Sequence, residues 1–125
     1  MWREFNPNPH GLQVGDCVIR AVAKAMDMPW EDAFLVVCME GYSLKDLPNA
    51  NRVWGHYLQN HGFHREWLPD TCPTCYTVEQ FAADHPNGTY ILAIDGHVVC
   101  VKDGDWFDSW NSKDRVPLYA WHKKE

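Results

Sequence analysis

The sequence lacks any long apolar run, which removes the main sequence signal of a membrane protein. No stretch approaches the 18 or so consecutive apolar residues that a membrane-spanning helix needs. Residues 1–9 also carry charges and prolines where a secretory signal peptide would have an apolar segment. The sequence therefore predicts a cytoplasmic protein with no membrane partner.

Positive charge is also scarce. Lys and Arg number 11 against 17 Asp and Glu, which gives a formal net charge of −6, and the basic residues are scattered. Because a nucleic-acid-binding domain needs a clustered basic surface, nucleic acid is not an expected partner. Internal repeats and low-complexity tracts are missing too. What remains is 125 residues, 46% of them hydrophobic, enough for one core and hence a single domain over residues 1–125.

The five cysteines are an odd number, and no secretion signal accompanies them. A disulfide framework is therefore not expected, whereas core, metal-binding or catalytic thiols are. Cys38 shares one face of a predicted helix with Phe34 and Leu35, and Cys100 shares a strand face with Val98. Both are expected to be packing residues.

Cys17 stands where a glycine-containing turn leads into an apolar helix. Asp16 has the side chain and the position of a helix cap, and Val18, Val22 and Met26 recur at helical spacing. Cys17 therefore falls in the first turn, where unpaired backbone N–H groups and the helix dipole favour a thiolate over a thiol. We interpret Cys17 as a candidate nucleophile. The alternative is an inert buried thiol, which is common for this residue type.

The hydrophobic periodicity changes along the chain from helical to strand-like. Residues 1–15 are expected to be an irregular arm because of their two closely spaced prolines. Helices are predicted over 17–26, 29–41, 51–60 and 77–84, a short strand over 63–68, and further strands over 89–94, 97–102, 105–110 and 116–122. Two Asp-Gly pairs between these strands are typical two-residue hairpin turns. We predict an α+β fold, with N-terminal helices packed on one face of a C-terminal antiparallel sheet of about four strands.

The second Asp-Gly pair, at 103–104, sets the register of its hairpin. With a two-residue loop, His97, Asp108 and Trp110 share one face of the sheet, and Asp108 lies diagonal to His97. A carboxylate in that place can fix the tautomer of the imidazole and stabilise its protonated form. A three-residue loop would reverse the parity and bring Ser109 or Asn111 near the ring instead.

A cysteine at a helix start, a histidine that opens a strand, and Asp108-Ser109-Trp110 on the next strand resemble the papain-like cysteine peptidase class. That class keeps the same order, often with Asn-Ser-Trp in the last segment. Aspartate there is similar to bacteriocin-processing peptidases of ABC transporters and to ovarian-tumour-type deubiquitinases. The Asp-Cys and Gly-His-Val sequences resemble bacterial cell-wall endopeptidases of the class, and the whole chain is similar to small uncharacterised papain-like proteins of tailed phages. The matching segments are 14–26 and 87–111.

The resemblance implies a papain-like fold with Cys17 as nucleophile, His97 as base and Asp108 as the orienting group. It also implies that Trp110 shields the histidine and that Gln13 helps to stabilise the oxyanion. The implied reaction is hydrolysis of a peptide, isopeptide or amide bond in a peptide or protein substrate, through a thioester and without a cofactor. A non-catalytic binding or inhibitory protein on the same frame is the alternative.

A second group of residues leaves a different interpretation open. Cys72 and Cys75 have Cys-x-x-Cys spacing, and with His61 and His64 they could supply four tetrahedral ligands to a structural zinc ion. A small zinc-stabilised interaction module is therefore a third hypothesis. Unbonded loop thiols are the simplest expectation for the two cysteines, because the βαβ context of a thioredoxin-like redox pair is missing.

Overall fold

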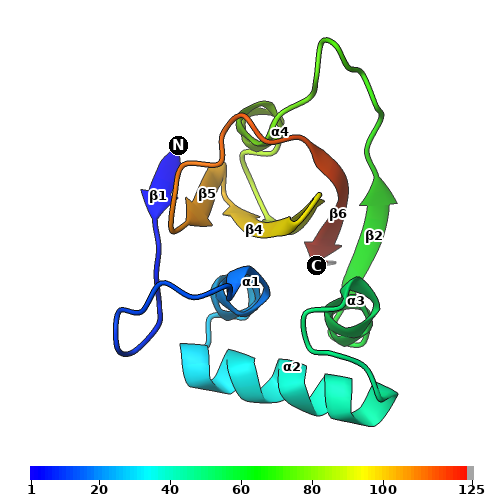
Figure 1. Cartoon of the computed structure of the whole chain (residues 1–125). Coiled ribbons are helices and arrows are strands. Elements are labelled where there is room, and N and C mark those ends of the chain that lie inside the picture. Colours follow the sequence, from blue (N-terminus) through cyan, green and yellow to red (C-terminus); the bar gives the residue numbers. More distant parts are fainter. Residues whose placement is uncertain (124–125) are drawn as a thin grey trace.

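Residues 1–123 are described by a computed structural model, and over them the chain forms four helices and six strands (Figure 1). The helices are α1 (Cys17–Met26), α2 (Trp30–Leu44), α3 (Asn51–Gln59) and α4 (Val78–Asp84). The strands are β1 (Trp2–Glu4), β2 (Phe63–Trp67), β3 (Thr89–Ile94), β4 (His97–Lys102), β5 (Asp105–Asp108) and β6 (Pro117–Lys123). The predicted α+β class is confirmed. No helix within these residues is both long and apolar enough to cross a membrane.

The strands of residues 1–123 form one sheet in the order β1-β5-β4-β3-β6-β2. The prediction of about four antiparallel strands is therefore wrong, because one strand is added at each edge. β2 pairs antiparallel with β6, whereas β1 pairs parallel with β5, so the sheet is mixed. β1 lies in the segment predicted to be irregular. A strand of three residues is too short to show a period of two, and this one forms because β5 offers it a free edge.

Each face of the sheet carries its own hydrophobic core. On one face, Val22 of α1 and Trp54 of α3 belong to the same cluster as Ile91 of β3. On the other face, Phe81 of α4 belongs to a cluster with Leu92, the next residue of β3. Figure 1 shows α1 and α4 on opposite sides of the curved strand β4. Helix packing on one face alone is thus right for α1–α3 and wrong for α4.

Both Asp-Gly hairpins have the predicted two-residue loops. Ile94 pairs with His97 across the first, and Lys102 pairs with Asp105 across the second. Residues 103 and 104 have positive φ angles of 51° and 81°, as the tight turns of two-residue hairpins require. The predicted register is therefore confirmed, and it brings the faces of His97 and Asp108 together.

Of two helix ends predicted from local sequence signals, one is wrong and one is confirmed. α2 continues past Gly41, the predicted stop, to Leu44. A Cβ at Gly41 would lie 2.7 Å from the carbonyl oxygen of Asp46, so this glycine permits close packing and does not end the helix. α4 starts with the predicted capping box, in which Thr77 and Gln80 each bond the backbone N–H of the other.

Candidate active site

Cys17 opens α1 and lines a cleft of about 360 Å³ together with His97 of β4. Its partly buried thiol hydrogen-bonds with the His97 imidazole and with the backbone of Val98. Gly15 and Asn49 also line this cleft, from the chain before α1 and the chain before α3. The predicted nucleophile and the predicted base, which are distant in sequence, therefore lie together in an accessible cleft.

His97 is held on its other side by Asp108, the last residue of β5. Its Nε2 lies 2.6 Å from Asp108 Oδ2, and the two side chains are only 8% and 1% exposed. An ionised carboxylate can only accept, so Nε2 donates and Nδ1 is left to face the sulfur of Cys17. The Trp110 ring lies 4.9 Å from the imidazole, centroid to centroid. The structure thus brings together the four residues that the sequence placed in one cluster.

The carboxylate of Asp108 accepts four hydrogen bonds from the described residues. Oδ2 accepts from His97 and from the Ser112 hydroxyl at 2.7 Å. Oδ1 accepts from the Ser109 backbone N–H at 2.8 Å and from Arg20 Nη2 at 3.1 Å. Burial would raise the pKa of Asp108, but these donors and the nearby positive charges lower it below its usual value. The carboxylate is therefore fixed in orientation and ionised.

Sequence reasoning missed Arg20 and Ser112, which complete this arrangement. Arg20 lies one turn after Cys17, buried in a helix whose other buried residues are apolar. The sequence could have indicated Arg20, because it is a charged residue among the apolar residues of a predicted helix and a buried guanidinium needs a partner. Ser112 follows β5 in a loop, where no pattern of the sequence marks it.

The electrostatics of the site favour a thiolate beside an imidazolium. Burial alone would lower the pKa of His97, but its hydrogen bonds to Asp108 and Cys17 raise it to about 9. Burial would likewise raise the pKa of Cys17, yet the hydrogen bond and the charge of His97 bring it below the ordinary value. Both shifts act in the same direction, toward the pair with the proton on the ring and the negative charge on the sulfur.

Asp16 stands at the start of α1 but does not cap the helix, which corrects the sequence prediction. Its side chain makes no cap hydrogen bond. Oδ1 instead accepts a short hydrogen bond from Arg20 Nη1, and Oδ2 accepts from Trp30 Nε1 at 2.9 Å. Within residues 1–123, none of the N–H groups of Cys17, Val18 and Ile19 has a main-chain or side-chain oxygen as acceptor. These donors remain available to a negative charge at the helix start.

Gln13 does not join the cluster. Its side chain is exposed, and it is not among the residues that line the cleft of Cys17 and His97. The backbone N–H of Cys17 is better placed as an oxyanion donor, because it is unpaired and belongs to the residue that carries the sulfur.

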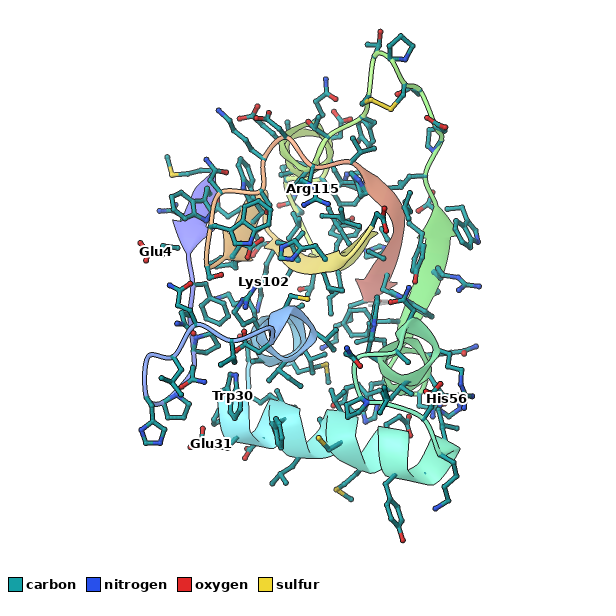
Figure 2. The ribbon with its side chains drawn as sticks, viewed as in Figure 1. Glu4, Trp30, Glu31, His56, Lys102 and Arg115 are labelled. Carbon is teal, nitrogen blue, oxygen red and sulfur yellow. A yellow bond between two sulfur atoms is a disulfide. The ribbon has the colours of Figure 1, made fainter. Side chains whose placement is uncertain are left out.

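The predicted zinc ligands are not assembled. Cys72 and Cys75 form a disulfide in the loop between β2 and α4, far from α1 in Figure 2. The prediction of unbonded thiols is therefore wrong, and these sulfurs are not free to bind a metal. His61 stacks on Tyr57, and His64 packs against His122. No group of three or more His, Cys, Asp or Glu side chains placed to hold a metal ion is found among residues 1–123.

The other two free thiols differ from Cys17 in their surroundings. Cys100 is completely buried, and burial raises its pKa to about 12, so it is chemically inert near neutral pH. Cys38 is partly buried like Cys17, but it lines a separate hollow next to Phe34. Cys38 is therefore a natural internal reference for the reactivity of Cys17.

The chain matches no protein-family model, no curated protein and no solved structure. The functional argument consequently rests on the geometry of the site and on the chemistry of its residues.

Proposed function

We propose that this protein is a papain-like thiol hydrolase that cleaves a peptide, isopeptide or amide bond through a thioester on Cys17. The observation that carries the proposal is the hydrogen-bonded series from Cys17 through His97 to Asp108, with the sulfur lining an accessible cleft. The resemblance of the sequence to papain-like cysteine peptidases supports the same roles, because the three residues occur in the same order.

In the first half-reaction the Cys17 thiolate attacks the substrate carbonyl carbon and forms a C–S bond, while the carbonyl π electrons move to oxygen. The unpaired N–H groups at the start of α1 stabilise this oxyanion. When the tetrahedral intermediate collapses, the C–N bond breaks and the leaving amine takes the proton of the His97 imidazolium. The products of this step are a thioester and a neutral imidazole.

In the second half-reaction His97 removes a proton from water, and the oxygen of that water attacks the thioester carbonyl. Collapse breaks the C–S bond and releases the acid, which restores the thiolate and the imidazolium. Asp108 holds the ring in the required tautomer throughout. Trp110, against the imidazole, limits the access of water to that hydrogen bond.

The proposal predicts that Cys17 is far more reactive than the other thiols of the same chain. An ordinary cysteine with a pKa near 8.5 is about 1% thiolate at pH 6.5. We therefore expect iodoacetamide at pH 6.5 to label Cys17 on the order of tenfold faster than Cys38, as mapped by mass spectrometry. Electrophilic peptide and ubiquitin-like probes should then modify the native protein but not Cys17→Ala, and would reveal the type of substrate.

His97→Ala is the matched variant, because it removes the partner of the thiolate and leaves Cys17 in place. We expect its Cys17 to be labelled at a rate close to that of Cys38. Equal labelling of Cys17 and Cys38 in the native protein, unchanged in His97→Ala, would contradict the proposal and favour a non-catalytic binding protein.

A further inference from the structure

Arg20 is an unusual residue to find inside this fold. It lies on α1, one turn after Cys17, and only 6% of its surface is exposed. Removing a guanidinium from water is unfavourable unless charged partners compensate it. Its surroundings on α1 are otherwise apolar, so packing alone would favour a leucine or a methionine at this position.

The guanidinium bridges two carboxylates from distant parts of the chain. Nη1 donates to Asp16, the residue just before Cys17, and Nη2 donates to Asp108 Oδ1 at 3.1 Å. The two carboxylates are 8% and 1% exposed, so the whole group is shielded from solvent. A planar fork of donors can bind two carboxylates at once, whereas the single ammonium of lysine cannot reproduce that geometry.

We infer that Arg20 is a positioning residue of the proposed hydrolase, which fixes the start of the nucleophile helix and the orienting carboxylate relative to each other. The inference rests on the proposed function. It assigns two separate effects to one side chain, one on Asp16 and one on Asp108.

The first effect concerns the N–H groups at the start of α1. An aspartate at this position normally turns its carboxylate onto those donors. Arg20 and the Trp30 indole, which reaches from α2 (Figure 2), occupy both oxygens of Asp16 and hold them away. Without Arg20 the carboxylate would be free to cap the helix. It would then compete with the thiolate and with the substrate oxyanion for the same donors.

The second effect concerns the choice of oxygen on Asp108. Arg20 and the Ser109 N–H engage Oδ1, which directs Oδ2 to His97. The guanidinium therefore acts on the imidazole through Asp108 and does not touch it. Its positive charge also lies close enough to Cys17 to favour the thiolate.

The experiment is the pH profile of Cys17 alkylation by iodoacetamide in the full chain. Five titratable or charged groups surround this sulfur or its partners. They are His97 of β4, Asp108 of β5, Asp95 of the β3–β4 turn, and Asp16 and Arg20 at the start of α1. The variants are Arg20→Met, which removes the bridge, Arg20→Lys, which keeps the charge, and Arg20→Met with Asp16→Asn, which also removes the carboxylate released by the first change. Arg3→Met is the control, since Arg3 is an exposed arginine that pairs with Asp105.

We expect Arg20→Met to move the alkylation profile to higher pH and to slow alkylation at pH 6.5 several-fold, because the released Asp16 carboxylate would compete with the thiolate for the N–H groups of the helix and the loss of the Arg20 charge would add to this effect. Arg20→Lys should give a smaller loss, since it retains the charge without the fork. Adding Asp16→Asn should recover part of the rate. If Arg20→Met does not fold, the double variant can be tested in its place, because it does not leave the Asp16 carboxylate buried without its arginine partner.

A purely structural role for Arg20 would lower the melting temperature and leave the alkylation profile of the folded variants like that of Arg3→Met, and this result would overturn the inference. Failure of the proposed function looks different. In that case Cys17 of the native protein would already react no faster than Cys38.

Discussion

Replacing Asp108 with asparagine should reveal how much of the charge on His97 depends on one carboxylate. The two side chains have nearly the same shape, so the change mainly removes the negative charge that faces Nε2 at 2.6 Å. The rise in the His97 pKa from 6.5 to about 9 corresponds to about 3 kcal/mol of extra stabilisation of the imidazolium. A neighbouring opposite charge typically accounts for roughly one to three units of such a shift. We therefore expect Asp108→Asn to return the pKa of His97 most of the way to 6.5.

The assay is a pH titration of the His97 ring by nuclear magnetic resonance of protein labelled with ¹⁵N in histidine. At pH 7.5 a ring with a pKa of about 9 is ~97% protonated, whereas a ring with the ordinary value of 6.5 is ~9% protonated. Because the ring titrates together with Cys17, the measured values belong to the pair. Iodoacetamide labelling of Cys17 in the same samples should slow as the imidazolium is lost.

Asp105→Asn is the matched control, because Asp105 lies on the same strand but pairs with Arg3 and the terminal ammonium. Its His97 titration should follow that of the native protein. If Asp108→Asn folds normally and its His97 still titrates near pH 9, the carboxylate does not set the charge of the ring. The electrostatic account of the site would then be wrong.

Two further predictions concern stability. The folded state raises the pKa of His97 from 6.5 to about 9 and lowers the pKa of Cys17. As the pH rises above 6.5, the shift of His97 makes the free energy of unfolding fall and the shift of Cys17 makes it rise, so the two effects oppose each other. Cys17→Ala removes the second effect and leaves the part of the His97 shift that comes from Asp108. Its stability, measured by urea unfolding, should therefore fall more steeply above pH 6.5 than that of the native protein; parallel curves for the two proteins would contradict this coupling. Ser112→Ala should lower the free energy of unfolding by about 1–3 kcal/mol, because Ser112 is fully buried and donates to the Asp108 carboxylate. A change below about 0.5 kcal/mol would show that this hydrogen bond has little weight in the fold.

The contact between His97 and Asp108 could be predicted because it depends on a local rule. An Asp-Gly pair between two strands specifies a two-residue loop, the loop specifies the register, and strict alternation then decides which side chains share a face. The observed pairing of Lys102 with Asp105 follows that logic. The proximity of Cys17 to His97 does not follow from this rule, since it depends on how α1 packs on the sheet.

The features that could not be predicted depend on partners distant in sequence. β1 has no pattern of its own and exists because β5 presents an unpaired edge. Asp16 has every local property of a helix cap, but its carboxylate is bound by Trp30 of α2 and by Arg20, whose own position depends on Asp108 of β5. The partner of Arg20 on β5 is 88 residues away, and no periodicity connects the two.

The distribution of the site along the chain bears on how the protein matures. Cys17 is synthesised about 80 residues before the ring that would ionise it. At 5–20 residues per second the ribosome needs roughly 4–16 s to cover that interval. During this time the emerging chain carries an ordinary thiol, so Cys17 would become activated only after the strand that carries His97 has been translated and has packed against α1.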